Sequence, residues 1–380
     1  MLRPAFVSLL AILSASGVAN AWFRVACTDP LVQERIDPVL NPGQNPSQHV
    51  HTVSLSHRPI TLTPTPPQVE GASNFGPTYD YNTLRASSCT SCEVAQDLSN
   101  YWYPKLYFHD RTANTFTAVD NGGLLVYYQN RGDDDVSNNG PGLKAFPPGL
   151  QMITGNPARR SKKYPVGEGS QGELGERAIQ WACLRYGSNV GYDNTNGTGF
   201  PWTDCESGFN ARLHMPACWD GVNLYKTDNS HVAYLSELDN GSCPPGYPVG
   251  LMKLFYEITW NVHDFADQWD PSTESWPFVY ATGDPTGYSW HGDFQNGWDT
   301  TALQNAIDNC NNPNDETGSG VTEACSYLTV TSASVANACK INPIVNEQVN
   351  GTLTKLPGCN PLQSGPADAT MYTDANCPSS

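Results

Sequence analysis

The residues with the clearest chemical potential are His49 and His51, which are separated by a single valine. Alternate residues of a β-strand project to the same side, so the two imidazoles can converge on one metal ion or one substrate group. Histidine is scarce, with eight in the chain, and we expect His231 and His291 to complete a four-histidine site. The alternative is a pair of exposed histidines on a strand edge.

A second candidate is the segment 283–299, which combines aspartates, glycines, one histidine and four aromatic residues. Flat aromatic rings stack on sugar rings, whereas carboxylates and an imidazole hydrogen-bond hydroxyl groups or move protons. Because glycine-rich loops bring the backbone close to a ligand, we predict a carbohydrate-binding cleft in this loop. The alternative is a surface loop whose aromatic rings fill a small satellite core.

A third candidate lies in the segments 218–223 and 228–232, where acidic residues bracket a turn that enters a strand. Simple Asx-turns are the alternative interpretation of these aspartates. Taken with the second segment, the substrate-binding candidates are Trp290, Tyr288, Trp298, Trp219, Asp284 and Asp220. The catalytic candidates are Asp293, His291, Glu257, Asp228 and His231.

The elements that must position these residues are expected to be mostly β-strands. The chain of 380 residues has 33 glycines and 30 prolines, which implies many turns. Short apolar or alternating runs predict strands at 49–55, 105–109, 124–129, 150–154, 178–184, 231–236, 251–263 and 278–281. One helix of about three turns is expected after Asp299. We therefore predict a mainly β fold, a single large β-sandwich or jelly-roll-like domain with few helices.

The compartment is indicated by the N-terminus and the cysteines. Residues 1–21 have a charged start, an apolar run and an Ala-Asn-Ala end, which is typical of a signal peptide and predicts a secreted, extracellular product. The twelve cysteines then predict six disulfides, with a structural role for Cys89 and Cys92 rather than zinc or redox chemistry. Sequons at Asn196, Asn240 and Asn350 suggest a glycoprotein.

Charge excludes several partners. The formal net charge of −17 disfavours nucleic acid and anionic membrane surfaces, since both would repel the protein. The remaining apolar runs are too short to span a bilayer. We expect a monomer whose partner is a polysaccharide substrate.

The order of several motifs resembles a family of secreted fungal proteins that carry a domain of unknown function. These motifs are SQHVH at 47–51, SNYWYP at 99–104, CWDG at 218–221, SHVAY at 230–234, GDPTG at 283–287 and HGDF at 291–294. The resemblance covers 22–325, which leaves 326–380 as a cysteine-containing extension that wraps the domain. Because members are sometimes fused to WSC or cellulose-binding modules, the resemblance implies a cell-wall polysaccharide as substrate.

Three functions are consistent with these residues. In the first, a glycoside hydrolase uses Asp293 as the ionised partner of a buried Glu257 that serves as the acid. In the second, His49, His51, His231 and His291 hold a metal ion that activates water, or act without metal as a polysaccharide lyase. The third is a non-catalytic carbohydrate-binding wall protein. No cofactor is required by the first, and a divalent metal is the cofactor of the second.

Overall fold

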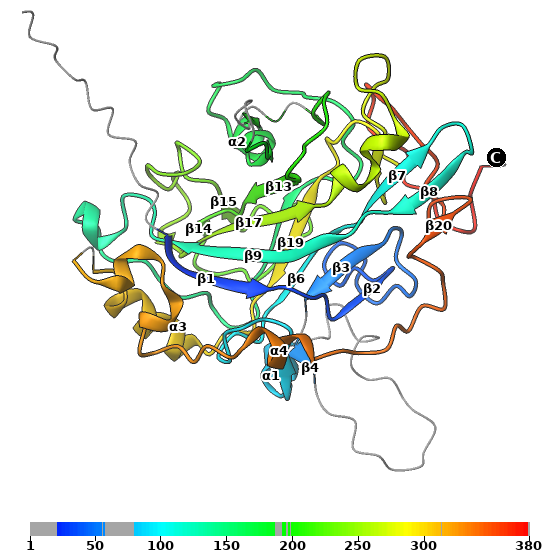
Figure 1. The fold of residues 1–380 in the computed structure, drawn as a ribbon. Helices are drawn as coiled ribbons and strands as arrows, with labels where there is room; N and C mark the ends of the chain where they lie inside the picture. The colour runs from blue at the N-terminus through cyan, green and yellow to red at the C-terminus, as the bar shows by residue number, and fades with distance from the viewer. Residues whose placement is uncertain are drawn as a thin grey trace, which may run out of the picture.

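Two antiparallel sheets form the centre of the fold (Figure 1). The computed structural model describes residues 21–54, 56–57, 80–186, 192–194, 197, 199–312 and 314–378. Nearly all of the expected signal peptide, and the sequon residue Asn196, lie outside the described residues. The first sheet contains, in spatial order, β1 (Ala21–Cys27), β9 (Asn121–Gln129), β17 (Lys253–Trp260), β13 (Phe209–His214), β11 (Ile179–Cys183) and β12 (Tyr192–Asn194). The second contains β10 (Gln151–Gly155), β19 (His291–Gln295), β6 (Asn100–Pro104), β3 (His51–Ser54) and β2 (Val32–Glu34).

The main hydrophobic core lies between these two sheets. The first sheet contributes residues such as Leu213 and Tyr256, and the second contributes residues such as Tyr101 and Phe294. The sheets approach closely at Gly292, where an added Cβ would lie 2.5 Å from Leu213 Cδ2. Since alternate residues of a strand face opposite sides, the residues of β19 that flank Gly292 point away from this core.

The strand β17 shows how sequence pattern sets this arrangement. Its even-numbered residues Leu254, Tyr256, Ile258 and Trp260 are all fully buried in the main core, as the alternation of the segment predicts. The odd-numbered residues Phe255, Glu257 and Thr259 face away from the core and are partly buried, whereas Lys253 at the start of the strand is fully buried. The strand ends at Trp260 and is followed by a 3-10 helix over Val262–Gln268.

Smaller elements surround the sandwich. Three short sheets contain β15 (Val232–Ala233), β14 (Cys218–Trp219) and β16 (Val249–Gly250); β18 (Phe278–Tyr280), β7 (Leu106–Asp110), β8 (Thr115–Ala118) and β20 (Thr352–Leu353); and β4 (Ser56–His57) with β5 (Cys89–Thr90). The α-helices are α1 (Tyr81–Arg85), α2 (Gln171–Arg177), α3 (Thr300–Asn309) and α4 (Ala333–Asn337). The mainly β fold with few helices is therefore confirmed.

Six disulfides connect the twelve cysteines: 27–92, 89–339, 183–205, 218–243, 310–325 and 359–377. Cys89 and Cys92 bond to different distant partners, which confirms their structural role. The C-terminal segment passes below the second sheet toward β20 (Figure 1). In the described part of the chain, no helix is long and apolar enough to cross a membrane.

Candidate functional site

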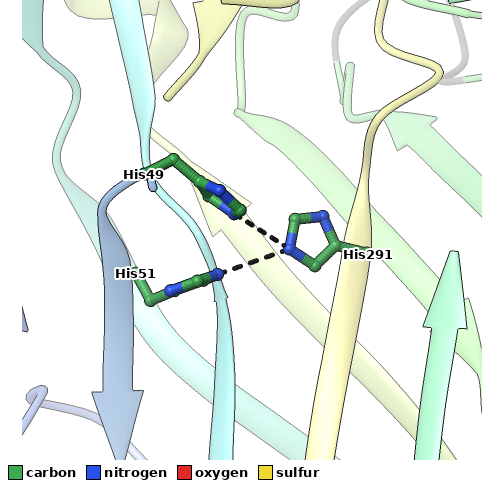
Figure 2. Close-up of side chains that lie close together, drawn as sticks. All are labelled: His49, His51 and His291. Carbon is green, nitrogen blue, oxygen red and sulfur yellow. Dashed lines mark hydrogen bonds between the residues drawn. The ribbon is translucent and has the colours of Figure 1, made fainter. Parts of the chain in front are cut away.

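Three histidines from two strands meet on the outer face of the second sheet, the face opposite the main core. His49 lies two residues before β3, His51 is the first residue of β3, and His291 is the first residue of β19. The strand β6 lies between β3 and β19. Figure 2 shows the imidazoles of His49 and His51 both directed at the ring of His291. All three side chains are buried, with at most 1% of each residue exposed.

The three Nε2 atoms face one another. His49 Nε2 lies 3.1 Å from His291 Nε2, and His51 Nε2 lies 3.4 Å from the same atom. All three rings offer a ligand atom within 4.8 Å of the others. Nitrogen atoms that bind one tetrahedral metal ion at 2.0–2.1 Å are about 3.3–3.4 Å apart. The observed spacing therefore fits a common metal ion with little movement.

The opposite nitrogen of each ring is already engaged. The Nδ1–H of His51 donates to the backbone oxygen of Ile36 at 2.7 Å, and that of His291 donates to the backbone oxygen of Ser289 at 2.7 Å. His49 Nδ1 lies 3.2 Å from the side-chain oxygen of Gln48. A neutral imidazole that donates through Nδ1 has only a lone pair at Nε2. The hydrogen bonds at the Nδ1 atoms thus orient the three rings so that their Nε2 lone pairs point to one place, as they do at metal centres.

Burial keeps these rings neutral. Loss of hydration lowers the pKa of His51 and of His291 to about 4, and it lowers that of His49 well below its ordinary value. The neighbouring imidazoles lower the pKa of His49 and His291 further. Neutral imidazole is the form that binds zinc, copper, nickel and iron.

Two buried carboxyl groups accompany the histidines. Asp293 lies two residues after His291 on the same face of β19, and neither of its carboxylate oxygens has a hydrogen-bond partner within the described ranges. Burial and the charge of Asp37 raise the pKa of Asp293 well above its usual range. Asp37 accepts hydrogen bonds from the backbone of Val39 and Leu40 at 3.2 and 2.8 Å. No spacing in the sequence indicated Asp37, because it joins the site only through tertiary contacts.

The segment that carries His49 and His51 is held by residues from the C-terminal part of the chain. Arg35 pairs with Glu347 at 2.5 Å and with Asp374 at 3.1 Å, and it donates to the backbone oxygen of Ser47 at 2.9 Å. Glu34 accepts from the backbone of residues 344 and 345 at 2.7 and 2.9 Å. We call these contacts the C-terminal clasp. It ties the segment that leads from β2 into β3 to the C-terminal part of the chain.

The fourth expected histidine does not join the cluster. His231 is buried, and its Nε2–H donates to the backbone oxygen of Gln151 at 2.6 Å. Its ring lies beside Tyr225, with 6.2 Å between ring centroids, and it is not part of the group that could share a metal ion. The expectation of four converging imidazoles is therefore corrected to three. His231 is anchored instead to the edge strand β10.

The expected pair of Glu257 and Asp293 is not formed. Glu257 lies on the outer face of the first sheet, where it pairs with Arg212 at 2.9 Å. Asp293 lies on the outer face of the second sheet, because Phe294 fills the core side of β19. The whole core therefore separates the two carboxyl groups, and the hydrolase mechanism that pairs them has no geometric support.

The aromatic residues of the segment 283–299 do not form an open platform. Trp290 and Trp298 are 1% and 0% exposed and belong to the main core. Their indole nitrogens donate to the backbone oxygen of Arg212 and to the hydroxyl of Tyr128. The expectation that these rings stack on a sugar is corrected, because no face of either ring is accessible. Moreover, this segment is not a loop throughout, since it contains the strand β19.

Two of the predicted acidic ligands stabilise turns instead. Asp284 is fully buried, accepts from the backbone of Thr286 and Ser289 at 2.7 Å, and lies 3.7 Å from Arg160. Asp220 accepts from the backbone of Val222 and Asn223 at 2.9 and 2.8 Å, as an Asx-turn does. These hydrogen bonds lower the pKa of Asp220 against the opposing effect of burial.

Trp219 also belongs to the Asp220 turn, since its indole nitrogen donates to the backbone oxygen of Asn223 at 2.7 Å. Its ring is partly buried and packs against the main core. Trp219 is thus occupied by local structure, as the Asx-turn interpretation of this segment predicts.

The remaining candidates, Tyr288 and Asp228, line a cavity of about 330 Å³. The same cavity is lined by Ile153 and Gly155 of β10, which pair with Asp293 and His291 of β19. An added Cβ at Gly155 would lie 2.7 Å from His291 Cβ. The cavity therefore lies against β10, the strand paired with the one that carries His291, although no histidine lines the cavity.

Comparison with known proteins gives a family but no activity. No curated protein and no solved structure matches the chain. Residues 37–298 match the model of a domain of unknown function (DUF1996), and this range includes His49, His51 and His291. The match covers more than half of the chain and confirms the resemblance seen in the sequence motifs. The chain belongs to the DUF1996 family of domains of unknown function.

Proposed function

We propose that this protein is a secreted, metal-dependent enzyme that acts on polysaccharide and binds its metal ion through His49, His51 and His291. The observation that carries the proposal is the set of three buried Nε2 atoms that face one another while each Nδ1 is engaged elsewhere. Three lone pairs at this spacing repel one another unless a cation lies between them. A metal ion provides that cation and satisfies all three groups at once.

A bound divalent ion would supply Lewis-acid activation of water or of a substrate oxygen. The chain supplies the remaining parts. The carbonyl oxygens of Ile36 and Ser289 orient two of the rings, the C-terminal clasp holds the segment before β3, and burial keeps bulk water from the rings. Asp293 is the carboxyl group placed to exchange a hydrogen bond with a ligand at this face, because its oxygens have no partner in the described part of the protein.

Secretion is supported by the cysteines and by the sequons. Six disulfides are typical of an oxidising compartment. Both sequon residues in the described part of the chain, Asn240 and Asn350, are exposed and can carry a glycan. Polysaccharide as substrate follows from the family resemblance and from the polar cavity beside the site.

The test is metal analysis of protein that has never met a chelator, followed by activity assays. We expect about one equivalent of a transition metal in the wild type, and much less in His51→Ala and His291→Ala. His231→Ala is the matched control, because this histidine is equally buried but lies outside the cluster. Less than one tenth of an equivalent in the wild type, with none taken up from added zinc or copper, would refute the metal site.

Activity is then followed by the release of reducing ends from a panel of polysaccharides. The wild type should release product only when loaded with metal, and Asp293→Asn should reduce the rate without removing the metal. Activity that is the same after complete chelation would show that the three histidines have another role.

A further inference from the structure

The cavity beside the histidines has the chemistry of a sugar-binding site. Its volume of about 330 Å³ falls at the lower end of the range of small-ligand pockets. The rings of Tyr164 and Tyr288 line it and are partly exposed, with 37% of Tyr164 accessible. Partly exposed rings of this kind offer flat apolar faces for the faces of sugar rings.

The polar groups of the cavity suit hydroxyl groups rather than charges. The guanidinium of Arg159 is neutralised by its ion pair with Glu176 and lies 3.8 Å from Asp368. Asp228 is exposed at the cavity and accepts a hydrogen bond from the backbone of Ser230 at 3.0 Å. Because Arg159 is already paired and the carboxylate of Asp228 remains, the cavity repels anions. The net charge of −17 acts in the same direction.

The walls of the cavity are fixed before any ligand binds. The side chain of Gln171 both donates to and accepts from the backbone of Tyr234, at 2.9 and 2.7 Å. The side chain of Asn229 donates to the backbone oxygen of Ile153 at 2.8 Å. Side chains held in this way lose little conformational entropy on binding, which favours affinity.

We infer that this cavity binds a segment of an uncharged polysaccharide chain next to the three histidines. The inference rests on the proposed function and adds the place and the charge class of the substrate. Its position follows from β10, since Ile153 and Gly155 line the cavity while they pair with Asp293 and His291. A chain lying in the cavity thus lies against β10, the strand next to the one that carries His291.

The test measures retardation of the protein in native gels that contain a soluble polysaccharide, with and without prior chelation. The gels contain mixed-linkage glucan, xylan or galactomannan as neutral chains, and polygalacturonate as the anionic chain. We expect retardation by at least one neutral chain, and none by polygalacturonate. Tyr288→Ala and Tyr164→Ala should weaken binding by about tenfold or more. The control is Tyr186→Ala, because Tyr186 is 79% exposed and does not line the cavity.

Several results would overturn the inference. They are binding by polygalacturonate alone, the absence of binding to every neutral chain, and cavity variants that bind as well as Tyr186→Ala. Melting curves of each variant identify any that fail to fold. In that case Asp228→Lys tests the cavity instead, because Asp228 is exposed and the new positive charge should allow the anionic chain to bind. If chelated protein still binds neutral chains but no metal is found, the cavity stands and the proposed metal function fails.

Discussion

The metal site makes a sharp prediction about stability, because a ligand that binds only the folded protein stabilises it. We expect zinc added to chelated wild type to raise the melting temperature, since the three Nε2 atoms are already spaced for a tetrahedral ion. His291→Ala should abolish most of this increase, because the Nε2 of His291 lies within 3.4 Å of the Nε2 of each of the other two histidines.

The magnitude follows from linkage. Free metal at one thousand times its dissociation constant stabilises the folded state by about 4 kcal/mol. For a chain of this length, unfolding entropy converts that energy into an increase of about 6 °C. Loss of one of three ligands should weaken binding at least about a hundredfold, as changes to groups that merely orient ligands already do. The increase should then fall to about 2 °C or less.

Differential scanning calorimetry of chelated protein, with and without added zinc, measures this difference within each variant. Comparing each variant with itself removes the separate cost of deleting a buried ring. His231→Ala should respond to zinc as the wild type does. An unchanged melting temperature in the wild type, or an equal loss of response in His231→Ala, would contradict the metal-site reasoning.

Further predictions concern the surroundings of the site. Gly155→Ala should destabilise the protein by about 3 kcal/mol or more, because Gly155 has a φ of +90° and a new Cβ would lie 2.7 Å from His291 Cα. Gly167→Ala, with a φ of +79° and no atom within 4 Å, should cost only about 1 kcal/mol in denaturant unfolding. Glu257→Gln should leave metal content and product release unchanged and alter stability by less than about 1 kcal/mol; a loss of product release would restore this carboxyl as a catalytic group. Burial raises the pKa of Asp97 to about 6 from 3.8. The stability that the protonated carboxyl contributes is therefore fully present below pH 3.8 and is lost as the pH rises through about 6. Denaturant unfolding at several pH values across this range should show the wild type losing about 3 kcal/mol of unfolding free energy relative to Asp97→Asn.

Part of the fold and of the site could be predicted from local pattern. The alternation of β17 correctly predicted its buried face, and the acidic cap at Asp299 accepts from the backbone of Thr301 and Ala302 at 3.0 Å, as expected at the start of α3. The spacing of His49 and His51 correctly predicted two imidazoles that converge on one point. Each of these features depends on the period of a single strand or on a single helix terminus.

The rest depends on how distant strands pair. β19 alternates its polar residues His291, Asp293 and Gln295 with Gly292 and Phe294, but the run is only five residues long and all five are buried. The main core covers one face and the N-terminal segment the other, so this strand resembled a loop in sequence. Glu257 was predicted on a strand and Asp293 in a loop, and only the assignment of β17 and β19 to different sheets shows that the core separates the two carboxyl groups.

The C-terminal clasp has a practical consequence for work on this family. The family match spans residues 37–298, which contains all three imidazoles, whereas Glu34, Arg35, Glu347 and Asp374 all fall outside it. A recombinant fragment limited to the matched range would keep the three histidines. It would lose the contacts that hold the segment carrying His49 and His51, and this segment would then be exposed to solvent. Activity should therefore be assayed on a longer polypeptide that keeps the residues on both sides of the matched range, because only then does a lack of activity bear on the proposed function.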